Sequence, residues 1–206
     1  LNEVRARFYA HGLIGHDLTG SSAALEVPQG EGANALYSAG LWMGGLSPDS
    51  QLKLAAMKYE PLGESDYSTG PLTTDGTATT NATMMAQYDH VWEVTREQVE
   101  LHMAYFQCIS DPDNCELAEE FPDGYEIPAG FFDWPAINTE PGFSIYQAPF
   151  YDLNHDGDYD PSVGDAPCIL GDQALYFVFN DKGAAHVLTG SQPIGVEIQA
   201  MPFAYN

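Results

Sequence analysis

The chain has 206 residues, of which 30 are acidic and only six are basic, so its net charge at pH 7 is −24. A surface with this charge repels nucleic acid and anionic membranes, and no apolar run reaches the roughly 18 residues that cross a bilayer. We therefore expect no nucleic-acid partner and no direct membrane insertion. The length allows one large domain or two small ones, and the 44% of hydrophobic residues predicts a globular chain. We expect a single domain over residues 1–206. The acidity is consistent with bound calcium or with a saline habitat, and composition does not separate the two.

Short alternating runs in the first third of the chain predict β-strands. Residues 3–10 alternate between apolar and polar side chains, and the runs 35–46 and 51–59 flank the sequence SPDS, which predicts a tight hairpin turn. The threonine-rich segment 71–85 predicts a long surface connection. It contains Asn81 in an Asn-Ala-Thr glycosylation acceptor, a short signal that leaves the use of the site open.

One segment has the spacing of a helix. Thr95 and Gln98 form a capping-box pattern, and apolar residues then recur at helical spacing without a proline, which predicts a helix over about 95–107. Farther on, the aromatic and β-branched run 173–183 predicts a central strand with a turn at its end, and residues 193–205 alternate again. The predicted fold class is mainly β, an antiparallel β-sandwich-like domain with one short helix and long loops.

An acidic loop at residues 152–165 carries the clearest chemical signal. The surrounding stretch YDLNHDGDYDPSVGD contains five aspartates and one asparagine but no lysine or arginine, so a folded loop needs a cation or must stay open to water. The alternating spacing directs side-chain oxygens at one centre, and Gly157 allows a sharp turn. Oxygen ligands suit calcium better than zinc or copper, and calcium is favoured over magnesium because magnesium prefers a stricter octahedron that retains more water. The predicted metal ligands are Asp152, Asn154, Asp156, Asp158 through its backbone carbonyl, Asp160 directly or through water, and Asp165.

This loop differs from the helix–loop–helix calcium motif. Position 12 of that motif is a glutamate, whereas here it is Val163, so Asp165 is the carboxylate expected to complete the ligand set. Pro161 and Gly164 also argue against a helix leaving the loop. We therefore predict a calcium loop outside the paired-helix setting, with a solvated acidic turn as the alternative.

The chain contains three cysteines. Cys108 and Cys115 enclose the turn-rich sequence ISDPDN, which favours a disulfide between them in an oxidising compartment and leaves Cys168 buried or free. A zinc site is the competing use, but the cysteines include no CxxC pair.

Motifs for catalysis are weak, and we do not expect an enzyme. The sequence contains no GxSxG, HExxH or glycine-rich phosphate loop, and its six histidines are scattered. Aromatic residues make up 12% of the chain and could form a sugar-stacking platform, while abundant carboxylates leave sugar hydrolysis open. A glycan-binding or glycan-degrading module is therefore the alternative function.

Blocks along almost the whole chain resemble a known class of protein. These blocks are NEVRARF, EVPQGEGANALYSAGLWMGGL, QLKLAAMKY, DYSTGPL, DWPA, APFYDLNHDGDYDPSVGD, GDQALYFVFNDKG and PIGVEIQAMPFAY. In this order they resemble the N-terminal region of large secreted surface proteins of the Bacteroidota, which carry a C-terminal type IX secretion sorting domain. The resemblance implies export across the outer membrane, cell-surface attachment and calcium in the aspartate loop. No sorting domain follows Asn206, so we expect a fragment of a longer chain.

Together these observations predict a calcium-stabilised extracellular domain with a structural or adhesive role at a cell surface or in a surface assembly. The expected partners are other domains of the same longer chain or other surface proteins, including further copies of itself, with glycans as partners under the alternative function.

Overall fold

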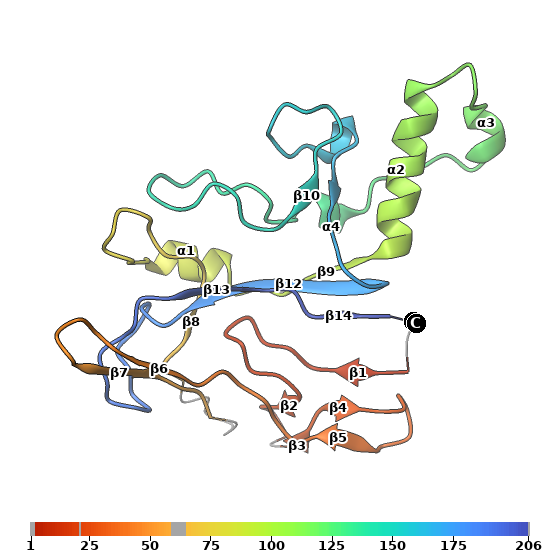
Figure 1. Cartoon of the computed structure of the whole chain (residues 1–206). Helices are drawn as coiled ribbons and strands as arrows, with labels where there is room; N and C mark the ends of the chain where they lie inside the picture. Colours follow the sequence, from red (N-terminus) through yellow and green to blue (C-terminus); the bar gives the residue numbers. More distant parts are fainter. Residues whose placement is uncertain (1–2, 21, 59–64, 206) are drawn as a thin grey trace.

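The structure of the chain is a computed structural model, and it describes residues 3–20, 22–58 and 65–205. The mainly β, antiparallel class predicted from the sequence is confirmed (Figure 1). The strands are β1 (Arg5–Ala6), β2 (His16–Asp17), β3 (Ser22–Ala23), β4 (Leu25–Glu26), β5 (Asn34–Leu36), β6 (Met43–Leu46), β7 (Leu52–Ala55), β8 (Ser68–Thr69), β9 (Trp92–Thr95), β10 (Phe150–Tyr151), β11 (Ala166–Pro167), β12 (Gln173–Asn180), β13 (Glu197–Ala200) and β14 (Phe203–Ala204). The helices are α1 (Ala82–Gln87), α2 (Arg96–Ser110), α3 (Leu117–Glu120), α4 (Ala129–Phe132) and the 3₁₀ helix η1 (Pro161–Val163).

Strand β12 organises the largest sheet, which has five strands among the described residues. It pairs antiparallel with β13 and β14 along one edge and with β8 and β9 along the other, so both of its edges are hydrogen-bonded. A smaller sheet has the order β1-β4-β5, and the remaining pairs are β2-β3, β6-β7 and β10-β11.

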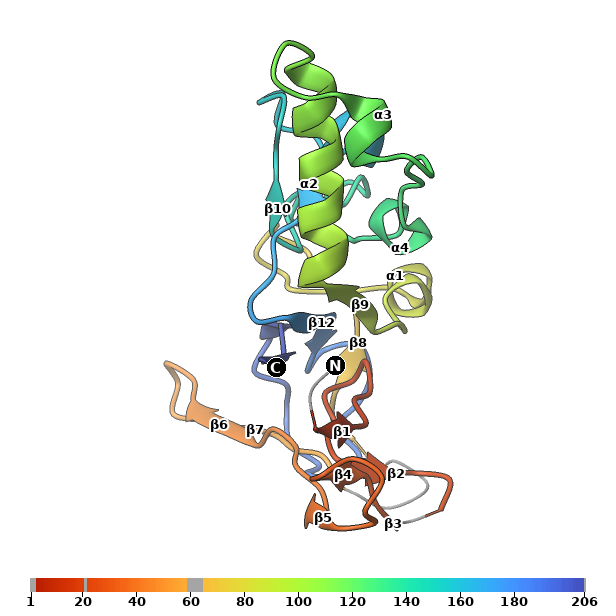
Figure 2. The ribbon, with the colours of Figure 1, turned by 90° about the vertical axis from the view of Figure 1, so that its right-hand side faces the viewer.

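Hydrophobic residues cover both faces of this sheet. Tyr176 and Val178 belong to a cluster on the side of the helices, whereas Phe177 and Phe179 belong to a second cluster on the side of the N-terminal strands. Figures 1 and 2 show α1, α2 and α4 on one side of the sheet and β1 to β5 on the other. A strand that is buried on both faces has no polar face, which explains the continuous apolar run at 174–179.

The predicted helix begins where its capping box places it. The Thr95 side chain accepts a hydrogen bond from the Gln98 backbone N–H at 3.3 Å, and the Gln98 side chain accepts one from the Thr95 N–H at 3.0 Å. This helix, α2, extends to Ser110, three residues beyond the predicted end.

The prediction of only one helix was wrong. Helices α1, α3 and α4 are short, and α1 begins within the predicted surface connection 71–85 and extends two residues beyond it. It begins there because the Asn81 side chain accepts a hydrogen bond from the Met84 backbone N–H at 3.0 Å, and an asparagine cap of this kind stabilises a first helical turn.

The predicted SPDS turn joins β6 to β7 in a two-stranded hairpin that stands out from the body of the protein (Figure 2). Its register runs from Met43 opposite Ala55 to Leu46 opposite Leu52. The last residue of the predicted strand 51–59 lies outside the described residues. Across the part of the chain that the structure describes, the longest helix is too short and too polar to span a bilayer.

Candidate metal-binding loop

The acidic loop 152–165 connects two short strands that pair with each other. Phe150 of β10 lies opposite Pro167 of β11, and Tyr151 lies opposite Ala166. This antiparallel pairing brings the two ends of the loop together, so carboxylates that are distant in the loop sequence can meet. The ring of Tyr159, within the loop, lies 5.4 Å from that of Phe150, and so anchors the loop to the hydrophobic cluster on the helix side.

Three carboxylates of the loop converge. One oxygen from each of Asp152, Asp156 and Asp165 lies within 4.8 Å of the other two. Asp165 is completely buried, Asp152 is partly buried and Asp156 is exposed, so the cluster runs from the protein interior to the surface. Two unit charges 4.8 Å apart repel by about 0.9 kcal/mol in bulk water and by about 3.5 kcal/mol at an effective dielectric constant of 20. A cation between the three carboxylates would reverse the sign of this energy.

Backbone N–H groups compensate part of the negative charge. The two oxygens of Asp165 accept hydrogen bonds from the backbone of Leu153 at 2.8 Å and of Asp160 at 2.9 Å, so this side chain links both ends of the loop. Asp152 accepts a hydrogen bond from the Gly157 N–H at 2.9 Å, and the positive φ of Gly157 (85°) allows this turn. Each carboxylate oxygen has two acceptor positions, so these hydrogen bonds leave room for a metal ion.

The other three predicted ligands have different local partners. The side chain of Asn154 donates to Asp156 Oδ2 at 2.8 Å, and Asp160 accepts from the Ser162 N–H at 2.8 Å, where it caps the 3₁₀ helix η1. The Asp158 side chain is exposed, and its backbone N–H donates to Asp156 Oδ1 at 2.9 Å. The structure thus brings together three of the predicted carboxylate ligands, and Asn154 and Asp158 are hydrogen-bonded to one of them, Asp156.

Helix α2 packs against the loop at Gly164, a contact that the sequence does not predict. Gly164 has φ 107°, and a Cβ atom there would lie 3.0 Å from Phe106 Cβ and would collide with Leu153. His102 is also buried here, with Nδ1 2.9 Å from the Tyr125 hydroxyl. Burial lowers the pKa of His102, against the opposing effect of the backbone at Gly164 and Asp165. Nothing in the local sequence indicates that His102, which precedes Gly164 by 62 residues, would face the loop, because the contact is tertiary.

The cysteines lie near this region. The structure joins Cys108 and Cys115 by a disulfide, with their Cα atoms 5.1 Å apart, and so links the last turn of α2 to the segment before α3. Cys168 follows β11, is half-buried and has no disulfide partner among the described residues.

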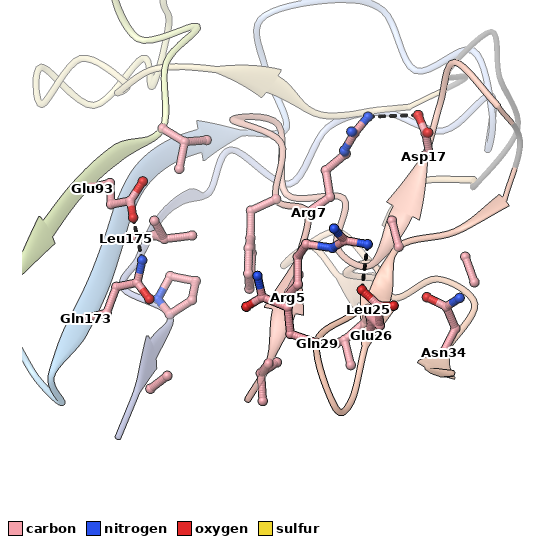
Figure 3. A pocket seen from close by; sticks show the side chains of 18 of the residues that line it. Arg5, Arg7, Asp17, Leu25, Glu26, Gln29, Asn34, Glu93, Gln173 and Leu175 are labelled. Atoms are coloured by element: carbon pink, nitrogen blue, oxygen red, sulfur yellow. Dashed lines mark hydrogen bonds and ion pairs between the residues drawn. The ribbon is translucent and has the colours of Figure 1, made fainter. Parts of the chain in front are cut away.

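A groove of about 980 Å³ lies between the N-terminal strands and the large sheet (Figure 3). Arg5 pairs with Glu26 at 2.5 Å and Arg7 with Asp17 at 2.8 Å, so the two guanidinium groups of the groove are held by its own carboxylates. On the opposite wall, formed by the large sheet, the side chain of Gln173 on β12 donates a hydrogen bond to Glu93 on the neighbouring strand β9. Charges paired in this way favour a structural role for these groups.

The loop is therefore the feature whose chemistry points most clearly to a ligand. Its converging donors are all oxygen atoms, and such donors suit a hard cation of calcium size. No protein-family model, no curated protein and no solved structure matches the chain.

Proposed function

We propose that this chain is a calcium-stabilised domain with a structural or adhesive role outside the cell. The observation that carries the proposal is the convergence of Asp152, Asp156 and Asp165 in a loop that contains no basic residue. All three side chains also hold backbone N–H groups of the same loop, so a bound ion would act mainly on the loop's own conformation.

A bound ion would stabilise more than the loop. Because Asp165 is buried beside α2, an ion held by it would fix the β10–β11 pair against the helix side of the core. Calcium binds the folded loop and has no preformed site in the unfolded chain, so its binding free energy adds to the free energy of unfolding.

The adhesive part of the proposal rests on the β6–β7 hairpin. Trp42, beside β6, is 74% exposed, and Leu46 and Leu52 on either side of the turn are 72% and 59% exposed. Large apolar side chains on a projecting hairpin favour contact with another protein surface. The net charge of −24 opposes association between copies unless salt or a cation offsets it. The extracellular location is supported by the sequence resemblance to secreted surface proteins.

Calcium titration by calorimetry, together with thermal unfolding in calcium and in chelator, tests this function. We expect calcium to bind and to raise the melting temperature, and Asp156→Ala to remove most of both effects. Asp123→Ala is the matched control, because this exposed aspartate lies outside the loop and its replacement should leave calcium binding unchanged. Absence of calcium binding, with the same melting temperature in calcium and in chelator, would refute the proposal.

One observation favours glycan binding as a second candidate function. Tyr146 is 60% exposed, and its hydroxyl lies 3.5 Å from the Gly157 carbonyl oxygen, beside the converging carboxylates. Exposed aromatic rings next to carboxylates are typical of sugar-binding surfaces. Retention on immobilised polysaccharides that Tyr146→Ala abolishes and Tyr205→Ala preserves would establish this function, whereas lack of retention would exclude it for the glycans tested.

A further inference from the structure

A second set of buried charges lies far from the acidic loop, around His186. The side chain of His186 is completely buried, and both of its ring nitrogens face backbone carbonyl oxygens. Nδ1 lies 2.7 Å from the carbonyl oxygen of Leu54, and Nε2 lies 2.5 Å from that of Asp181. A carbonyl oxygen can only accept a hydrogen bond, so each ring nitrogen must carry a hydrogen to make its contact. A neutral imidazole has only one such hydrogen and would direct a lone pair at the other carbonyl.

Two buried carboxylates flank the ring. Nδ1 is 3.9 Å from Asp66 Oδ2 and Nε2 is 3.9 Å from Asp181 Oδ2, and both aspartate side chains are fully buried. Two buried negative charges without a compensating cation would be unfavourable. Among the described residues, Tyr67 is a further titratable group here, and its pKa is raised to about 12 by burial and by Asp181 and Asp66, so it stays neutral.

The carboxylates in turn hold the chain that follows β12. Asp181 accepts hydrogen bonds from three successive backbone N–H groups, those of Ile194 at 2.5 Å and of Gly195 and Val196 at 2.8 Å. Its position is therefore tied to the return of the chain into β13.

Asp66 holds the other half of the same segment. It accepts hydrogen bonds from the Leu188 N–H at 2.9 Å and the Thr189 hydroxyl at 2.8 Å, and also from the Ala56 N–H at 3.2 Å beyond β7. Burial raises the pKa of Asp66, but the hydrogen bonds from Thr189 and from the two backbone N–H groups outweigh it and hold that pKa below its ordinary value.

We propose that His186 is a doubly protonated imidazolium in the folded protein and acts as an internal cation that fastens the segment 186–196 to β7 and to the end of β12. The histidine neutralises one part of this buried acidic cluster, as the proposed calcium ion would do in the loop 152–165. This site contains its own cation, so its integrity does not depend on added metal. The inference stands independently of the calcium proposal.

Nuclear magnetic resonance of the ¹⁵N-labelled chain at neutral pH tests the protonation state directly. We expect both ring nitrogens of His186 to carry a slowly exchanging hydrogen, with the same spectrum in calcium and in chelator. A ring with one protonated and one bare nitrogen would overturn the proposal. This measurement uses the unmodified protein, so it gives an answer even if substitutions at this position prevent folding.

A substitution tests the fastening role. Glutamine at position 186 has one donor group and one acceptor and no charge, so it cannot supply hydrogens to both carbonyl oxygens. We expect His186→Gln to increase hydrogen exchange at the Ile194, Gly195 and Val196 amides by roughly tenfold or more. His90→Gln is the matched control, because His90 is exposed, and it should leave these amides unchanged. Unchanged exchange in His186→Gln would show that the ring does not hold the segment.

Discussion

Replacing Asp165 with asparagine separates a calcium site from an acidic turn that merely contains internal hydrogen bonds. The change keeps the size of the side chain and one acceptor oxygen but removes the negative charge. Without metal, two effects oppose each other. Repulsion with the nearby oxygens of Asp152 and Asp156 disappears, which favours the variant. One of the two hydrogen bonds to the backbone is lost, because an amide NH₂ group cannot accept a hydrogen bond.

The structure allows both effects to be estimated. At 4.8 Å, the repulsion between Asp165 and the exposed Asp156 is close to the value in water, about 0.9 kcal/mol. The repulsion between Asp165 and the more buried Asp152 lies between this value and the value of about 3.5 kcal/mol at a dielectric constant of 20. Removing the charge of Asp165 therefore relieves roughly 2–4 kcal/mol of repulsion in total. The lost hydrogen bond to a charged acceptor costs about 1.5–3 kcal/mol. We therefore expect the metal-free variant to lie within about 2.5 kcal/mol of the unmodified protein in its free energy of unfolding.

Calcium should then distinguish the two proteins. At a calcium concentration 100 times the dissociation constant, the unmodified protein gains about 2.7 kcal/mol, whereas the variant has lost a ligand and should gain much less. For a chain of this length the gain corresponds to a rise in melting temperature of roughly 5–11 °C. Differential scanning calorimetry in chelator and across a calcium series measures both responses.

Asp158→Asn is the control for removing one charge from the loop. Its side chain is exposed and lies outside the converging cluster, so this variant should keep the full calcium response. Equal calcium responses in the Asp165 variant and the unmodified protein would refute the assignment of Asp165 as a ligand. A large loss of stability at Asp165 that is the same with and without calcium would favour the acidic-turn alternative.

Three further outcomes are expected. In denaturant titrations, Gly164→Ala should lower the free energy of unfolding by about 1–3 kcal/mol more than Gly142→Ala. Both glycines have positive φ, but of the two only Gly164 lacks space for a methyl group. Equal losses would contradict the packing of the loop on α2. Alkylation without reductant should label one cysteine, because Cys108 and Cys115 are bridged, and mass spectrometry showing three labels would disprove the bridge. Because the folded-state pKa of Asp66 is lowered, its contribution to stability is present above its unfolded value of about 4 and is lost as the pH falls through the folded value. The acid limb of the stability curve should therefore be shallower in Asp66→Asn, and an unchanged limb would argue against this sign.

The features that could be predicted from the sequence depend on residues that are close together in the chain. The capping box needs only Thr95 and Gln98, and the hairpin at SPDS needs only a turn between two apolar runs. The acidic loop is also local, since its predicted ligands lie within residues 152–165. Such patterns depend on backbone geometry within a short segment. They therefore predict where these elements lie in the chain, but not which distant residues pack against them.

The rest of the candidate site could not be predicted because its partners are distant in sequence. His102 approaches the loop only after α2 has packed on β11, and no spacing rule connects it to Gly164. The same is true of His186, whose contact with Leu54 crosses 132 residues. Helix α1 was missed for a different reason: the polar, threonine-rich segment 71–85 predicts a surface connection, but the Asn81 side chain caps a helix that begins near the end of that segment.

The central position of β12 has a consequence for the order in which the molecule can fold. Both hydrophobic clusters include residues of this strand, and the Asn180 side chain donates a hydrogen bond to Gly70 across 110 residues. A chain that emerges with its N-terminus first therefore lacks the strand that joins its two clusters until Asn180, the last residue of β12, has appeared. Such long-range pairing slows folding, because loops must close before the contacts form. For a protein that is exported as we propose, this delay would keep the nascent chain incompletely folded, and thus able to pass through a narrow channel, until β12 has been synthesised.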